Sequence, residues 1–262
     1  MMQSLKDLTG FEISALDGPI GHLREAYFDD ARWVVRHVVV DTGGWLAGRR
    51  VLISPHAIQR IDVARGVLDV ALSRQQIEQA PAVDSDRPVS RQYEIESSAF
   101  YGHPYYWGGA GLWGVLDMPL GGAIGPYTER EAGRAPLTEP TPLERERIAA
   151  EREAADPHLR SSAEVIGYEV AAHDGAIGHA ADFLIDPGSW QIVMLVIDTH
   201  NWLPDRLVML PPARVGSLDG GAHQVVVKMN RQAVKDSPPW DRHTPMDRDA
   251  VIRMQRHFEG YE

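Results

Sequence analysis

The sequence contains no cysteine. Disulfides, thiolate nucleophiles, iron–sulfur clusters and cysteine-ligated zinc sites are therefore excluded. Long apolar runs are also missing, because the longest one covers only residues 192–197, whereas a membrane-spanning helix needs roughly 20 apolar residues. Residues 1–9 lack the apolar stretch of a signal peptide. We therefore expect a cytoplasmic protein without a transmembrane segment.

Positive charge is scarce. The chain has 26 lysine and arginine residues against 37 aspartate and glutamate residues, which gives a net charge of −11. A broad face for nucleic acid or for an anionic membrane is not favoured by this balance. Hydrophobic residues make up 44% of the 262 residues, which is typical of a globular protein with a real core.

The chain contains an internal repeat with a period of 157 residues. Residues 10–81 align without gaps on residues 167–238, and 23 of the 72 pairs are identical. Chance would give about 4 identities at ordinary composition. The repeat predicts copy one at 1–82, a connector at 83–159, copy two at 160–240 and a C-terminal tail at 241–262.

Each copy has the pattern of short strands. Asp17-Gly18 and Asp174-Gly175 are tight-turn dipeptides. The apolar runs 34–41 and 192–198 are typical of strands that are covered on both faces. Ser73 and Asn230 each have the spacing of an N-cap for a short helix. Five or so strands in about 70 residues predict a small closed β-barrel, because closure removes exposed edges.

Four segments of copy one carry a family resemblance: G-F-E-I-x-x-x-D-G-x-I-G-H, W-x-V-x-x-V-V-V-D-T-x-x-W-L, V-L-I-S-P and S-R-Q-Q-I-E-Q-A-P. This pattern resembles the PRC-barrel family, which includes the cytoplasmic domain of the photosynthetic reaction-centre H subunit and the C-terminal domain of a ribosome maturation factor. The resemblance covers both copies. It implies a mainly β fold with two small PRC-type β-barrels that act as binding and assembly modules, without a shared enzymatic activity.

The connector 83–159 has a different composition. Its segment 93–113 combines glycines with seven aromatic residues. So many glycines argue against a helix, and so many rings argue against a passive tether. We expect a strap that packs on a barrel; the alternative is a recognition loop. A short charged helix is predicted over 141–155, and an amphipathic helix over 244–258 with Val251, Met254, Gln255 and Phe258 on one face. The aromatic candidates for binding are Tyr101, Tyr105, Tyr106, Trp107 and Trp113.

Two further pairs of residues sit in equivalent loops of the copies. Trp45 and Trp202 are candidates for binding anchors, and the alternative is that each caps its own barrel or packs on the other copy. Asp41 with Arg49, and Asp198 with Arg206, are predicted to form cross-strand ion pairs that fix these loops. These pairs have no second group or pocket for acid–base catalysis.

Neither nucleotide nor metal chemistry is favoured by the remaining motifs. The segment 109–114 reads G-x-G-x-x-G, but the strand before it and the helix after it that a dinucleotide site needs are not expected there. His22 and His179 follow the turn glycines of two hairpins without further spaced ligands. We expect them to be strand residues that face solvent or a neighbouring loop.

The sequence thus favours a non-catalytic binding or scaffold module that recognises a protein partner, with no cofactor and no metal. A homodimer, or peripheral association with a membrane-bound or photosynthetic-type complex, is compatible with this role. The two barrels are expected to pair through matching surfaces. One alternative is a ligand-binding or enzymatic role at a cleft between the barrels. Another is a factor associated with RNA or the ribosome, which the acidic charge disfavours.

Overall fold

A computed structural model describes residues 1–46, 48–80, 91–108, 111–114, 116–119, 158–199, 203, 206–242 and 244–259. The chain divides into two compact units. The second-copy unit consists of Met1–Thr9, Glu25–Val35 and Arg160–Glu262, and the first-copy unit consists of Gly10–Arg24 and Arg36–Leu159. Each unit is thus named after the sequence copy that supplies most of its strands.

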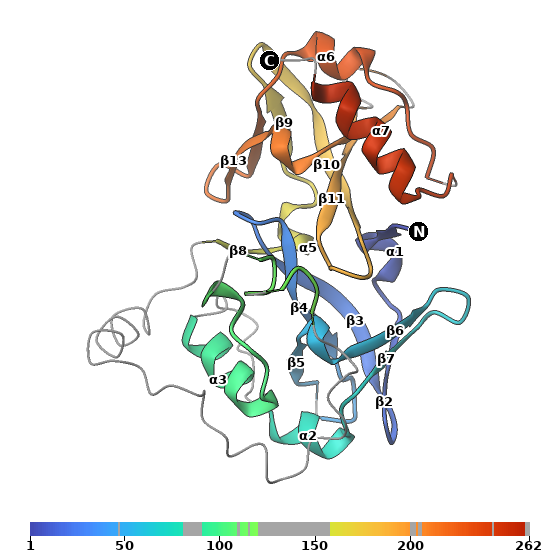
Figure 1. Ribbon diagram of the computed structural model, residues 1–262, viewed down its shortest axis with the longest axis vertical. Helices are drawn as coiled ribbons and strands as arrows, with labels where there is room; N and C mark the ends of the chain where they lie inside the picture. The colour runs from blue at the N-terminus through green and yellow to red at the C-terminus, as the bar shows by residue number, and fades with distance from the viewer. Residues whose placement is uncertain are drawn as a thin grey trace, which may run out of the picture. The chain divides into compact units, whose positions relative to one another are not determined.

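Both copies are mainly β, as predicted, with a few short helices (Figure 1). Copy one and the segment after it contain β1 (Gln3–Ser4), α1 (Leu5–Leu8), β2 (Glu12–Ala15), β3 (Gly18–Asp29), β4 (Val34–Asp41), β5 (Arg50–Ile53), the 3₁₀ helix η1 (Pro55–Ala57), β6 (Ile58–Asp62), β7 (Val67–Val70), α2 (Arg74–Gln79), α3 (Arg91–Tyr101) and η2 (Tyr106–Gly108). Copy two and its tail contain β8 (Leu159–Ser161), α5 (Ser162–Val165), β9 (Glu169–Ala172), β10 (Gly175–Ile185), β11 (Ile192–Asp198), β12 (Leu207–Leu210), η3 (Pro212–Arg214), β13 (Val215–Asp219), β14 (Gln224–Val227), α6 (Arg231–Asp236) and α7 (Arg248–Glu259).

The secondary structure repeats with the same period as the sequence. β2 and β9, β5 and β12, and α2 and α6 have identical bounds after a shift of 157 residues. The shift also relates α1 to α5 and the start of α3 to the start of α7. The structural repeat is therefore longer than the aligned segments 10–81 and 167–238. It also includes α3, which lies in the predicted connector, and α7, which lies in the predicted tail.

Two seven-stranded sheets contain these strands. Their orders are β5-β4-β3-β2-β7-β6, with β8 on β3, and β12-β11-β10-β9-β14-β13, with β1 on β10. Both paths are open, so the prediction of closed barrels is wrong for the described residues. The two end strands of each path are consecutive in the chain and are joined by a 3₁₀ turn that begins with a proline. Proline has no N–H to donate to a ladder, and the turn separates the strands there.

Burial follows the predicted strand pattern. Seven of the eight residues of β4 are buried, which fits a strand covered on both faces. One glycine near the start of β3 and the equivalent glycine of β10 are required by the close approach of the neighbouring strand. Gly21 has a φ of +147°, and a Cβ on it would collide with the backbone carbonyl of Asp41. Gly178 has the same φ and the same relation to Asp198, so both copies use a side-chain-free contact between neighbouring strands.

The N-caps of the short helices α2 and α6 are the predicted ones, whereas the long helices α3 and α7 differ from the prediction. Ser73 accepts from the Gln76 N–H while the Gln76 side chain accepts from the Ser73 N–H, and Asn230 caps α6. The expectation that 93–113 contains no helix is wrong, because α3 extends to Tyr101 and the glycines begin only at position 102. α7 begins at Arg248, later than predicted, because Asp247 accepts from the Ala250 N–H as its N-cap.

The first strand of each copy pairs with the long strand of the other copy. β1 pairs antiparallel with β10, so that Ser4 lies opposite Leu184, and β8 pairs with β3. The N-cap serines reinforce this exchange. Ser4 Oγ donates to the buried carboxylate of Asp182 at 2.5 Å, and Ser161 Oγ donates to Glu25 in the equivalent position.

No helix among the described residues is long and apolar enough to span a membrane.

Candidate functional site

The first-copy unit covers one face of its sheet with the segment after α3. We call this segment, residues 102–119, the strap. It lies over β4, where the Arg36 side chain is fully buried with 0% exposure. The Arg36 guanidinium lies 3.9 Å from the ring centre of Tyr106 and 5.0 Å from that of Trp113. Its Nη1 also donates to the carbonyl oxygen of Leu112 at 2.5 Å, so both rings and the strap backbone are held on one cation.

The aromatic residues of the connector divide into two groups. Tyr101, Tyr106 and Trp113 are buried, and Trp113 also contacts the ring of His56 on η1 at 4.8 Å between ring centres. Tyr105 and Trp107 are half-buried and stack on each other at 4.8 Å. The buried rings have the contacts expected of a strap, and the half-buried pair lies at the surface.

A buried polar cluster fixes α3 against the same strand. The Glu94 carboxylate of α3 has 0% exposure and accepts from the Tyr106 hydroxyl at 2.6 Å. His37 Nε2 on β4 lies 3.3 Å from the same Glu94 oxygen. Burial, together with the nearby His56 and His37, lowers the pKa of His103 from 6.5 to about 3. The cluster links a strand, a helix and the strap through one carboxylate.

Among the described residues, the same face of copy two has neither the polar cluster nor the covering rings. Val193 stands at the position of Arg36, and Ala213 stands at the position of His56. His56 has 7% exposure, whereas Ala213 is exposed and both Val193 and Pro212 are half-buried. A surface that copy one buries is therefore open in copy two, although the strands and the 3₁₀ turn beneath it are the same.

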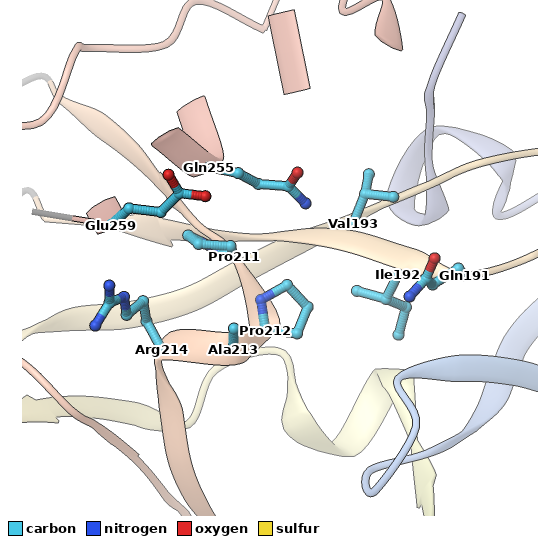
Figure 2. A pocket seen from close by; sticks show the side chains of 9 residues that line it. All are labelled: Gln191, Ile192, Val193, Pro211, Pro212, Ala213, Arg214, Gln255 and Glu259. Atoms are coloured by element: carbon cyan, nitrogen blue, oxygen red, sulfur yellow. The ribbon is translucent and has the colours of Figure 1, made fainter. Parts of the chain in front are cut away.

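This open face forms a groove of about 360 Å³ in the second-copy unit (Figure 2). Its floor is apolar and is made by β11 and η3. Gln255 and Glu259 of α7 lie on one side, and Arg214 lies across from them (Figure 2). The Arg214 guanidinium donates to the Phe258 carbonyl oxygen, which fixes α7 next to η3.

The helices that flank the two faces bury matching positions. The buried residues of α3 are Glu94, Ser97 and Tyr101, and those of α7 are Val251, Met254 and Phe258. Each pair is separated by 157 residues. The helix–sheet contact is thus polar in copy one and apolar in copy two. Gln255, which was predicted on the buried face of α7, is exposed and lines the groove.

The predicted loop residues have other partners than expected. Asp41 lies 3.8 Å from Arg24, and the strand register places Arg50 opposite Asp41. Arg49 instead donates to the carbonyl oxygens of Glu78 and Ala80 at the end of α2. The predicted Asp41–Arg49 pair is therefore wrong, because adjacent residues on a strand point to opposite faces.

In copy two, Arg206 has the same kind of partner as Arg49, and the predicted Asp198–Arg206 pair is wrong as well. Arg206 donates to the Ser237 carbonyl oxygen after α6, and Asp198 lies opposite Leu207 in the ladder. In copy one, Trp45 is half-buried and its ring stacks on the Arg74 guanidinium at 4.6 Å. Trp202 lies outside the described residues, as do the predicted helix 141–155 and two residues of the G-x-G-x-x-G motif, Gly109 and Ala110.

The described part of that motif forms no helix. Gly111 bridges to Gly114, and Trp113 bridges to Leu116. His22 and His179 are exposed strand residues, as predicted. Among the described residues, no group of three or more histidine and carboxylate side chains is placed to bind a metal.

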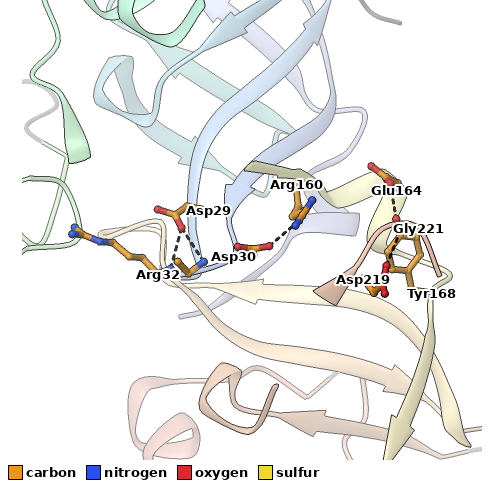
Figure 3. A network of polar contacts seen from close by, with 9 residues as sticks. Asp29, Asp30, Arg32, Arg160, Glu164, Tyr168, Asp219 and Gly221 are labelled. Atoms are coloured by element: carbon orange, nitrogen blue, oxygen red, sulfur yellow. Dashed lines mark hydrogen bonds and ion pairs between the residues drawn. The ribbon is translucent and has the colours of Figure 1, made fainter. Parts of the chain in front are cut away.

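A further polar network in the second-copy unit is structural (Figure 3). Arg160 on β8 donates to Asp30 at 2.7 Å, which ties β8 to the turn after β3. The Tyr168 hydroxyl donates to Glu164, and burial together with this bond raises the pKa of Tyr168 to about 12. Donors and acceptors in this network satisfy one another.

Arg36, His37 and Glu94 were not predicted as site residues from the sequence. For Arg36 and His37 a signal was present: the run 34–41 of copy one contains both, whereas residues 192–197 of copy two are all apolar. Two charged or titratable residues inside a strand buried on both faces require buried partners. The chain matches no protein-family model and no curated protein at a significant level.

Proposed function

We propose that the protein is a non-catalytic protein-binding module, built from two copies of a PRC-type β domain, and that the groove of copy two is its docking surface. One observation carries this proposal. The same strands and the same 3₁₀ turn bury Arg36 and His56 in copy one but leave Val193 and Ala213 open in copy two. Copy one thus acts as an internal reference for how this face is covered.

The cost of exposing the face supports the proposal. Burying apolar surface contributes about 25 cal/mol per Å², and copy one gains this contribution with its strap. Copy two has small apolar side chains at the equivalent positions and gains nothing from them while they face water. A hollow with an apolar floor and a few polar groups at its edge is typical of a binding site.

The charge of the chain favours a protein as the partner. A net charge of −11 opposes the counterion-driven binding on which nucleic-acid affinity depends. The flanking groups Gln255, Glu259 and Arg214 provide a mixed polar rim around an apolar floor. This is the usual anatomy of a protein interface. The family resemblance, which implies an assembly module, agrees with this assignment.

The test is to fill the groove. Ala213→Trp places a large ring in it, and Ala222→Trp places the same ring on an exposed turn of the same unit. Tagged parent protein and both variants are used to capture proteins from an extract of the source organism, and a protein captured by the parent is then purified for calorimetry. We expect Ala222→Trp to bind it like the parent and Ala213→Trp to bind it at least tenfold more weakly. Equal binding by all three would refute the proposed docking surface.

A further inference from the structure

We infer that the groove of copy two takes an extended segment of a partner protein that carries a tryptophan or tyrosine anchor, as the strap does on copy one. This inference rests on the proposed function and specifies its partner. The strap shows what covers the equivalent surface: two rings, Tyr106 and Trp113, lie over β4, and Trp113 lies against η1. Gly111 and Gly114 bridge to each other in this segment, and a Cβ on either would collide with the strap backbone.

The substitutions between the copies change the floor without closing it. Val193 replaces Arg36, so the cation under the rings becomes an aliphatic side chain. Ala213 replaces His56, whose ring lies 4.8 Å from that of Trp113 in copy one. Both changes remove volume from the same surface, and the first also removes a positive charge. The resulting hollow of about 360 Å³ lies within the size range of sites that hold a compact ligand group.

The rim favours a ring with a hydrogen-bond donor. Glu259 is exposed at the end of α7, and its carboxylate reaches the groove beside Gln255 (Figure 2). A tryptophan N–H or a tyrosine O–H can donate to such a carboxylate while the ring lies on Pro212 and Val193. Phenylalanine has no such donor. The Arg214 guanidinium, which donates to the Phe258 carbonyl, instead holds the wall of the groove in place.

The strap of the same chain is not the expected occupant. Its backbone is bound to Arg36 through Leu112, and its rings are buried in the first-copy unit. A separate peptide with the strap sequence is nevertheless a suitable probe, because it presents the same rings and glycines without that attachment.

The experiment uses the full chain and a synthetic peptide of residues 102–114, G-H-P-Y-Y-W-G-G-A-G-L-W-G. A control peptide has alanine in place of both tyrosines and both tryptophans. Calorimetry measures the binding of each peptide to the parent protein, to Ala213→Trp and to Ala222→Trp. We expect saturable binding of the aromatic peptide to the parent and to Ala222→Trp, a loss of at least tenfold in Ala213→Trp, and no binding of the control peptide.

Each other outcome overturns the inference. Absence of peptide binding excludes an aromatic segment as the occupant. Binding that Ala213→Trp leaves unchanged places the peptide elsewhere, for example in exchange with the strap. In either case the capture experiment still decides the proposed function independently: if Ala213→Trp weakens the natural partner while the peptide fails, the docking surface stands and the partner chemistry is different.

Discussion

At the residue scale, the contrast between Arg36 and Val193 explains why the two copies differ. A buried guanidinium needs partners for its charge and its donors, and copy one supplies the Leu112 carbonyl and two aromatic rings from the strap. Val193 needs no such partners, so copy two keeps its strand in place without a cover. The difference between Arg36 and Val193 therefore determines whether this position in the strand needs buried partners from a covering segment.

Gly21 gives a direct test of the close strand contact. Gly21→Ala should lower the free energy of unfolding by about 1–3 kcal/mol from backbone strain alone, because the residue has a φ of +147° and its new Cβ would meet the Asp41 carbonyl. Urea unfolding measures the change. Gly44→Ala, on an exposed loop with no atom within 4 Å of the added Cβ, should stay within about 0.5 kcal/mol of the parent. Equal midpoints for the two variants would contradict the structure.

His103 should make the first-copy unit sensitive to acid. Its pKa is lowered from 6.5 to about 3 in the folded chain, so between these values the unfolded chain binds the extra proton. The free energy of unfolding therefore falls as the pH decreases from about 6.5 toward 3. In His103→Phe, which keeps a ring beside Tyr101 and His56, this fall should be smaller. Urea unfolding at a series of pH values measures both slopes, and identical slopes would show that His103 is not buried as a neutral ring.

At the element scale, α3 and α7 are the same helix of the repeat and bury the same positions, which carry polar side chains in α3 and apolar ones in α7. The sequence predicted the repeat, the strands, the turn dipeptides and the caps of α2 and α6, because these depend on local pattern. It did not reveal α3, because glycines beyond Tyr101 were counted against the whole segment. It also predicted closure from the number of strands, whereas the proline turns at η1 and η3 leave the path open.

The groove could not be predicted from sequence for a different reason. Val193, Pro212 and Ala213 have ordinary apolar identities, and only their exposure relative to Arg36, Pro55 and His56 makes them informative. Exposure depends on whether a remote segment covers the face, and local pattern does not encode this.

The polar cluster of copy one should be replaceable as a set but not one residue at a time. Glu94→Val alone should destabilise the chain by about 3–5 kcal/mol, because it leaves buried polar groups without their acceptor. The combination Arg36→Val, His37→Met, Glu94→Val and Tyr106→Phe copies the apolar contact of Val193, Met194 and Val251. Urea unfolding should show the combined variant to be more stable than Glu94→Val. A combined loss equal to the sum of the single losses would mean that the cluster does not act as a unit.

At the scale of the whole molecule, the two sequence copies are not the two compact units. The second-copy unit contains residues 1–9 and 25–35 of copy one. Within it, Phe28 and Phe183 are both fully buried with ring centres 5.1 Å apart, and Ser4 and the Lys6 N–H donate to Asp182. A repeat that arose by duplication has thus become dependent on its other copy.

This dependence predicts that copy two does not fold alone. A fragment of residues 158–262 lacks β1 and Phe28, so Phe183 loses its ring contact and Asp182 loses two donors. We expect its urea unfolding to show no cooperative transition, or a midpoint well below that of the full chain. A fragment that unfolds cooperatively at the parent midpoint would mean that the exchanged segments do not contribute.

The face that the strap covers in copy one is proposed to be a docking surface in copy two. Amide hydrogen exchange of the full chain, followed with and without the peptide of residues 102–114, measures this without any substitution. We expect slowed exchange at Gln191–Val193 and at Ala213–Arg214, which line the groove, with unchanged exchange at Arg36 and His56. Unchanged exchange along the groove at a saturating peptide concentration, or protection confined to β4 and η1, would contradict it.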